Sequence, residues 1–141
     1  MKSVLRNEPV AVLDACALIA FLNNEDGAGV VAEALQEVPL VKMAAVNVLE
    51  VAYDAVRQTG QKDAAGEILR NVAALGLNID STLSDEMIQR AAVFKTSFRL
   101  SLADSIALAL AAVHGAPLLT SDRRDFSPIH EAKAARIIFI R

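Results

Sequence analysis

Acidic side chains follow two of the predicted strands, at the points where those strands end. Asp14 comes directly after the apolar run Val10–Leu13, and Asp122 follows the strand 117–120 within two residues. Parallel strands end at one edge of a sheet, where open sheets bind their ligands, so we expect the two carboxylates to lie close together. Taken alone, each aspartate is equally consistent with a cap on the helix that follows its strand.

A third acid lies on the predicted helix 47–58, which starts at the end of another strand. Glu50 shares the only polar stripe of this helix with Asn47, Asp54 and Arg57. A stripe of this kind is usually a solvated face. Because Glu50 lies near the strand end, we expect it to face the same sheet edge as Asp14.

A fourth acid, Asp104, completes a capping-box pattern that begins at Ser101. The run 106–113 that follows is apolar on every side, which predicts a helix buried inside the protein. The positive end of the helix dipole favours a carboxylate there, and we expect Asp104 to stay ionised. Asp104 therefore either caps the helix only, or caps it and also binds a ligand.

Four carboxylates at one sheet edge have a specific chemical consequence. Two of them ~5 Å apart repel each other by about 3 kcal/mol at an effective dielectric constant near 20. A cation relieves this repulsion, and an oxygen-only ligand set without a histidine or cysteine cluster favours Mg²⁺ or Mn²⁺ over zinc. The chemistry that such an ion supports is phosphodiester hydrolysis, because it activates water and offsets charge on the leaving oxygen.

The elements that must position these acids alternate between strands and helices. This alternation predicts one α/β domain over residues 1–141, with three layers and a central, mostly parallel sheet flanked by helices. We expect strands at 10–13, 40–45, 77–79, 117–120 and 137–140, and helices at 15–22, 30–35, 47–58, 61–75, 84–98 and 101–114. The segment after Asp122, including His130, is expected to be a polar connection.

The composition narrows the class of protein further. The chain has 141 residues, is 54% hydrophobic, and carries a net charge of −3, which excludes a disordered protein and a generic basic nucleic-acid coat. Its single cysteine, Cys16, cannot form an internal disulfide, so we expect a reducing, cytoplasmic location. No run is apolar for the ~20 residues that a membrane helix needs. The surplus of apolar residues predicts a partner surface.

Four short segments that contain these acids resemble the PIN-domain nucleases, and specifically the VapC toxins of toxin–antitoxin pairs. The matching segments are 12–19, 45–51, 100–104 and 119–126, in the order of the family. The resemblance implies a Mg²⁺- or Mn²⁺-dependent endoribonuclease with catalytic acids Asp14, Glu50, Asp104 and Asp122. Three of these, Asp14, Asp104 and Asp122, are implied metal ligands. It also implies a homodimer, a cognate antitoxin partner and an RNA substrate.

Other residues are candidates for supporting roles. The resemblance implies Asp125 as a further acid and Thr120 as a residue that orients a carboxylate, and Asn47 accompanies Glu50. Cys16 departs from the family, which often has serine or threonine at this position; a small buried side chain is the expectation, rather than an acidified thiol. We expect RNA phosphate contacts and RNA shape to dominate recognition, with basic candidates Lys95, Arg99, Arg123 and Arg124.

Two other functions remain open at the level of the sequence. A phosphoaspartyl phosphatase or a receiver-like domain also places acids after parallel strands, but Cys16 stands where such a phosphatase has its second acid. A receiver-like domain would need a lysine near Thr120. The remaining alternative is a non-catalytic binding module, in which the acids only cap helices and the apolar surface serves assembly.

Overall fold

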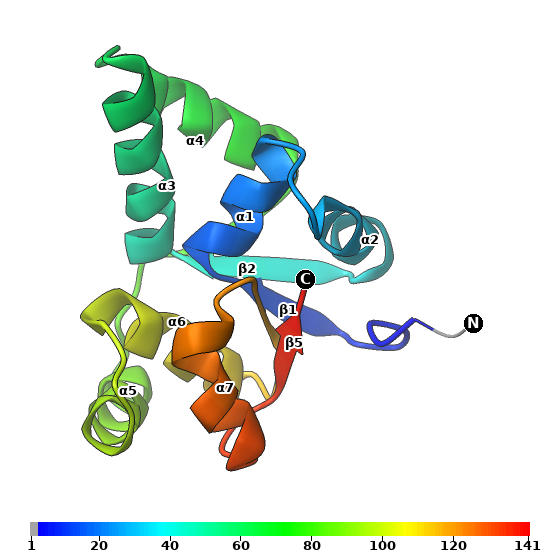
Figure 1. The fold of residues 1–141 in the computed structure, drawn as a ribbon, viewed down its shortest axis with the longest axis vertical. Helices are drawn as coiled ribbons and strands as arrows, with labels where there is room; N and C mark the ends of the chain where they lie inside the picture. Colours follow the sequence, from blue (N-terminus) through cyan, green and yellow to red (C-terminus); the bar gives the residue numbers. More distant parts are fainter. Residues whose placement is uncertain (1–2) are drawn as a thin grey trace.

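A computed structural model of the chain describes residues 3–141 (Figure 1). Its centre is a five-stranded sheet in which every neighbouring pair is parallel, in the order β3-β2-β1-β4-β5. The strands are β1 (Val10–Leu13), β2 (Leu40–Ala44), β3 (Asn78–Asp80), β4 (Leu118–Thr120) and β5 (Ile137–Phe139). The predicted strands and their parallel arrangement are confirmed.

Seven helices connect the strands within residues 3–141. They are α1 (Ala15–Leu22), α2 (Ala28–Glu37), α3 (Ala45–Thr59), α4 (Ala64–Ala74), α5 (Asp85–Ser97), α6 (Leu102–Val113) and α7 (Arg123–Glu131).

The expectation of a polar connection after Asp122 is wrong, because α7 occupies that segment. This helix begins with charged residues, contains Pro128, and buries only Phe126 and Ile129, so its apolar pattern is short. The ring of His130, on α7, lies edge-on to the Phe139 ring with 5.6 Å between centroids.

The helices cover both faces of the sheet and form three layers. Figure 1 shows α1–α4 above the strands and α5–α7 below them. Alternate residues of β1 point to opposite faces: Ala11 and Leu13 pack in the cluster with α1–α4, whereas Val12 packs in the cluster with α5–α7. The three-layer α/β prediction is therefore confirmed.

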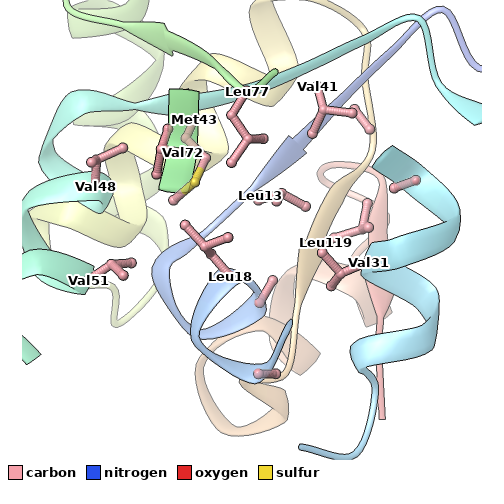
Figure 2. Packing of buried hydrophobic residues seen from close by; sticks show 14 of the residues in the cluster. Leu13, Leu18, Val31, Val41, Met43, Val48, Val51, Val72, Leu77 and Leu119 are labelled. Atoms are coloured by element: carbon pink, nitrogen blue, oxygen red, sulfur yellow. The ribbon is translucent and has the colours of Figure 1, made fainter. Parts of the chain in front are cut away.

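The upper core is built from side chains of the strands and of the helices that follow them. Figure 2 shows Leu13 of β1 and Met43 of β2 packed with Leu18 of α1 and Val51 of α3. The same buried side chains hold the first turns of α1 and α3 against the ends of their strands. Two of the candidate acids lie beside these turns: Asp14 precedes α1 as its N-cap, and Glu50 lies in the second turn of α3.

The lower core centres on α6, which is buried along most of its length. Every residue of 107–111 is at most 1% exposed. Alanine at three of these five positions lets the helix approach the sheet closely, and Phe126 of α7 packs beside it. The prediction of a buried helix after Asp104 is confirmed. In residues 3–141, no helix is long and apolar enough to cross a membrane.

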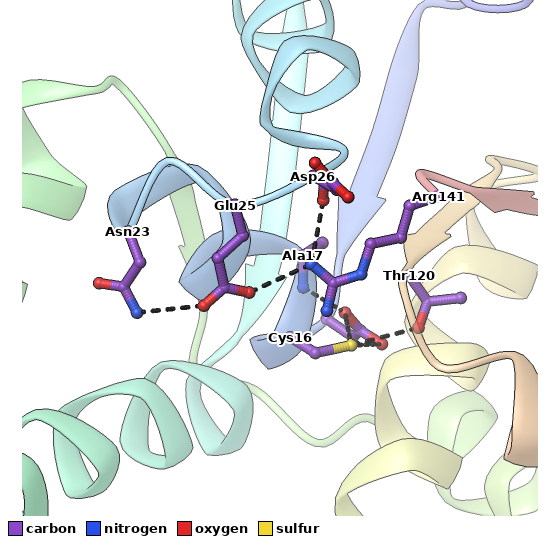
Figure 3. A network of polar contacts seen from close by, with 8 residues as sticks. Cys16, Ala17, Asn23, Glu25, Asp26, Thr120 and Arg141 are labelled. Atoms are coloured by element: carbon purple, nitrogen blue, oxygen red, sulfur yellow. Dashed lines mark hydrogen bonds and ion pairs between the residues drawn. The ribbon is translucent and has the colours of Figure 1, made fainter.

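The C-terminal segment lies against the turn between α1 and α2. Gly27 has a φ of +94°, and a Cβ atom at this position would lie 2.8 Å from the backbone oxygen of Ile140. Arg141 donates hydrogen bonds to the Glu25 carboxylate and to the Asp26 carbonyl oxygen (Figure 3). At position 27, glycine is therefore required both by the positive φ and by the close approach of the Ile140 backbone.

Candidate metal centre

All four candidate catalytic acids line one pocket at the carboxyl end of the sheet. Its cavity volume is about 360 Å³. Asp14 follows β1, Glu50 lies on α3 after β2, and Asp122 follows β4, so three neighbouring strands each contribute one acid. The fourth acid comes from the first turn of α6. The full lining is Asp14, Ala15, Cys16, Ile19, Glu50, Tyr53, Asp54, Arg57, Ser101, Asp104 and Asp122.

Asp14 is the most buried of these acids, with 2% exposure. It caps α1, and its Oδ1 accepts a hydrogen bond of 2.9 Å from the Ala17 amide. Burial raises the pKa of Asp14, and the charge of Asp122 adds to this effect, whereas hydrogen bonds from Thr120, Ala17 and Cys16 lower the pKa in part. The carboxylate is thus held in a fixed orientation, and no residue of 3–141 forms an ion pair with it.

Cys16 and Thr120, both labelled in Figure 3, form a polar network with Asp14. The Cys16 thiol donates to both Asp14 carboxylate oxygens, with sulfur–oxygen distances of 3.1 and 3.2 Å, and lies 3.4 Å from the Thr120 hydroxyl. Burial and the charge of Asp14 raise the pKa of Cys16 to about 11. The cysteine is therefore a protonated donor, and the structure agrees with the expectation of a small, largely buried side chain that is not acidified.

Asp104 lies at the start of α6, where its backbone amide donates a 3.0 Å hydrogen bond to the Ser101 hydroxyl. The expectation that this carboxylate stays ionised is wrong for the metal-free protein. Burial raises the pKa of Asp104 to about 7, with further contributions from the negative charges of Asp14, Asp122 and Glu50. The helix dipole stabilises the carboxylate less than burial and three neighbouring acids destabilise it.

Asp122 and Asp125 complete the acidic cluster from the start of α7. Asp122 caps this helix, because its Oδ1 accepts a 3.0 Å hydrogen bond from the Asp125 amide. Carboxylate oxygens of Asp104, Asp122 and Asp125 all lie within 4.8 Å of one another. Partial burial and the charge of Asp122 raise the pKa of Asp125, and Arg124 lowers it. The structure thus brings Asp125 to the acids that precede it in the chain.

Glu50 is oriented by Asn47, one turn earlier on α3. The Asn47 amide donates a 3.1 Å hydrogen bond to Glu50 Oε1 and lies 3.5 Å from the carbonyl oxygen of Ala103. Asn47 is completely buried, and its Oδ1 has no hydrogen-bond partner within residues 3–141. Asn47 therefore connects α3 to the start of α6, so that Glu50 and Asp104 are positioned relative to each other.

On α3, the pocket includes three residues that the sequence did not single out as site residues. Tyr53, Asp54 and Arg57 line the cavity on the same face of α3 as Glu50. Their spacing from Glu50 is three, four and seven positions, which places side chains on one helical face. Asp54 and Arg57 belong to the polar stripe seen in the sequence, and Tyr53 does not; the stripe alone does not distinguish a pocket wall from a solvated face.

The four predicted RNA contacts lie outside the lining of this pocket. Lys95 donates a 2.9 Å hydrogen bond to the Leu100 carbonyl oxygen, and Arg99 is exposed. The Arg123 guanidinium lies over the Phe139 ring at 4.5 Å and donates to the Arg141 carbonyl oxygen. Arg124 is exposed and lies close enough to Asp125 to lower its pKa. Of the four, Arg124 is the one whose charge acts on the acidic cluster.

The chemistry of this pocket suits a hard divalent cation. The charged side chains that could bind a metal ion here are carboxylates. Burial, and secondly the negative charge of neighbouring acids, raises the pKa values of Asp14, Asp104 and Asp125. The only sulfur in the lining, that of Cys16, stays protonated. Oxygen ligands without a thiolate or imidazole fit Mg²⁺ or Mn²⁺ better than Zn²⁺.

Several solved structures that are similar to this chain are toxins or toxin–antitoxin complexes. A toxin-antitoxin complex from Klebsiella pneumoniae superimposes with a TM-score of 0.69 at 23% identity, covering 93% of this chain and 98% of that one. VapBC2 from Rickettsia felis, bound to a promoter DNA fragment, gives 0.72 at 14% identity, with coverages of 92% and 98%. Mycobacterium tuberculosis VapC20, described as a Sarcin-Ricin loop cleaving toxin, gives 0.65 at 16% identity, with coverages of 84% and 93%.

These identities are low, so the structural similarity shows a shared fold. Among curated protein sequences, none is significantly similar to this chain. The sequence model of the PIN domain family, in contrast, matches residues 11–131. This range contains all seven helices and the strands other than β5, apart from the first residue of β1. The match and the shared fold agree: this protein belongs to the PIN domain family.

Proposed function

We propose that this chain is a Mg²⁺- or Mn²⁺-dependent endoribonuclease and the toxin component of a type II toxin–antitoxin system. The observation that carries the proposal is the convergence of Asp14, Glu50, Asp104 and Asp122 on one pocket at the carboxyl end of the sheet. Membership in the PIN domain family supports it, as does the fold shared with VapC20, which is described as a Sarcin-Ricin loop cleaving toxin.

In this proposal Asp14, Asp104 and Asp122 hold the cation, and Asp125 is close enough to Asp104 and Asp122 to join them. A bound divalent cation supplies water activation and charge compensation at the leaving oxygen. Within the pocket, Asp14 is kept in place by the Ala17 amide and the Cys16 thiol. Asp104 then carries its charge when its carboxylate faces a cation, because the attraction lowers its pKa.

Glu50 is the proposed general base. Its Oε1 accepts a hydrogen bond from Asn47, which leaves Oε2 to accept the proton of an attacking water. Asn47 is a positioning residue in this scheme, since it holds Glu50 without itself reaching the reacting atoms.

The proposal includes an antitoxin partner, a homodimer and a cytoplasmic location. Several similar structures are complexes of a toxin with its antitoxin, which supports a protein partner for this chain. Exposed apolar side chains on and beside α5 support self-association, namely Leu83, Ile88 and Val93. Size-exclusion chromatography at several protein concentrations tests the dimer, and a monomer at all of them contradicts it.

Cleavage of RNA by the purified full chain, freed of antitoxin, tests the central proposal. We expect cleavage with Mg²⁺ or Mn²⁺, none with EDTA, and at least a hundredfold loss in the Asp14→Asn variant. Asp63→Asn is the matched control, because Asp63 is an exposed acid at the start of α4, outside the pocket.

Intact cleavage by Asp14→Asn would exclude the proposed site. Absence of metal-dependent cleavage, together with no Mn²⁺ binding in calorimetry, would favour the non-catalytic binding module. The toxin role is tested in cells: expression should arrest growth, and co-expression of the protein encoded beside it should relieve the arrest.

A further inference from the structure

An exposed tyrosine and arginine stand at the wall of the acidic pocket, on α3. Tyr53 and Arg57 both line the cavity, four positions apart on the face that also carries Glu50. The Tyr53 side chain is 65% exposed, although large aromatic side chains are usually buried. The Arg57 guanidinium carbon lies 5.9 Å from the centre of the Tyr53 ring. The two side chains thus form one continuous surface beside the acids.

Arg57 is held in place but keeps most of its hydrogen-bonding capacity. Its Nη2 donates a 2.8 Å hydrogen bond to Asp54 Oδ1, and Gln58 donates to both Asp54 oxygens at 3.2 and 3.1 Å. A guanidinium has five N–H donors, so one bond to Asp54 leaves four for a ligand. Within the lining of the pocket, Arg57 supplies the only positively charged side chain.

We propose that Tyr53 and Arg57 bind one nucleotide of single-stranded RNA beside the acidic site, with its base stacked on the Tyr53 ring and a neighbouring phosphate bound by Arg57. This inference rests on the proposed ribonuclease function and names a substrate contact of the same pocket. It adds a stacking contact to the phosphate contacts expected from the sequence.

The charges around Tyr53 favour RNA over a protein segment as the occupant. The acids repel RNA phosphodiesters and Arg57 attracts them, so we expect the RNA to enter the pocket beside Arg57. An apolar protein segment on Tyr53 would cover the exposed Arg57 guanidinium of the Arg57–Asp54 ion pair and remove its hydration without replacing it. A stacked nucleotide leaves the edge of that pair in water and offers a phosphate to the free N–H groups.

The composition of the chain provides a direct probe of this contact. Tyr53 is the only tyrosine and there is no tryptophan, so the intrinsic emission of the protein reports on this side chain. A short single-stranded RNA is titrated into the protein in Ca²⁺ buffer. Ca²⁺ binds oxygen ligands, and leaving out Mg²⁺ and Mn²⁺ is intended to keep the RNA uncleaved during the measurement. Tyrosine emission and the anisotropy of a labelled copy of the RNA are measured in parallel, and circular dichroism verifies that each variant is folded.

We expect RNA binding to quench Tyr53 emission. Loss of one stacked base in Tyr53→Ala should weaken RNA binding about 5- to 100-fold, whereas Tyr53→Phe should bind like wild type. Arg57→Ala should weaken binding and lower the slope of log K against log salt by about 0.7, the value for one phosphate contact on a single strand. Leu69→Ala and Arg70→Ala, at exposed positions of α4 outside the pocket, should leave affinity and slope unchanged.

Three results would overturn the inference: RNA binding without quenching, wild-type affinity in both alanine variants, or a Tyr53→Ala variant that changes the size of the assembly but not RNA affinity. The last result would assign Tyr53 to a protein interface. If wild-type protein cleaves RNA with Mg²⁺ but any of these results is found, the inference fails and the ribonuclease stands. Quenching by RNA without metal-dependent cleavage supports the contact and refutes the ribonuclease. A folded protein that neither binds nor cleaves RNA would refute both proposals.

Discussion

Replacing Asp104 by asparagine should stabilise the metal-free protein at neutral and alkaline pH. The substitution preserves the shape of the side chain and the backbone amide that bonds to Ser101, so the start of α6 is kept. It removes a carboxylate that is partly buried beside Asp14, Asp122 and Glu50. A fold that tolerates an unfavourable charge should gain stability when that charge is removed.

The size of the effect follows from the pKa of Asp104. A carboxyl pKa of about 7 in the folded state, against 3.8 in the unfolded chain, corresponds to about 4 kcal/mol at 1.36 kcal/mol per pH unit. Asp104 is partly exposed, and solvent screens its interactions, so we expect about 1–2 kcal/mol. Between pH 4 and pH 7 the folded protein binds more protons at this site than the unfolded chain, so wild-type stability falls as the pH rises through this range and is not lowered further above it.

Urea denaturation in EDTA at pH 5 and pH 8 measures this difference. The advantage of Asp104→Asn over wild type should increase by about 1 kcal/mol from pH 5 to pH 8. Asp85→Asn is the control, because Asp85 is an exposed first-turn acid of α5, a helix that Ser84 caps. Adding Mn²⁺ at a hundred times its Kd should stabilise the wild type by about 2.7 kcal/mol and stabilise Asp104→Asn less. An Asp104→Asn protein that is equally or less stable than wild type at pH 8 in EDTA would refute the reasoning.

Three other predictions concern residues that support the site or the fold. Cys16, with a pKa of about 11, should react with iodoacetamide at pH 8 at least tenfold more slowly in the folded protein than in urea, and equal rates would contradict its burial. Asn47→Ala should lower the rate of RNA cleavage about tenfold with little change in RNA affinity, because Glu50 loses its hydrogen bond; an unchanged rate would remove Asn47 from the positioning role. Gly27→Ala should destabilise the fold by about 2 kcal/mol in urea denaturation, since its φ is positive and its Cβ would contact Ile140, whereas Gly29→Ala, with open space around it, should not.

Much of the fold could be predicted from the sequence because its most buried elements carry uninterrupted apolar runs. Val10–Leu13 is a short apolar run typical of a strand covered on both faces, and 106–113 is apolar on every side. The structure confirms both. The sequence does not predict α7, because this helix buries only two side chains and so has no clear apolar periodicity. Its start is specified by the Asp122 cap instead.

The sequence by itself determined which acids reach the carboxyl edge of the sheet, since strand order along the chain and parallel pairing bring the strand ends together. Only the tertiary structure decided the pKa values of these acids and which side chains surround them. The pKa of Asp104 depends on burial and on acids from three other segments, and the neighbours of Asp125 become visible once α7 is formed. Tyr53 and Arg57 likewise became pocket residues only when α3 was placed beside α6, because helical spacing specifies a shared face but not what that face meets.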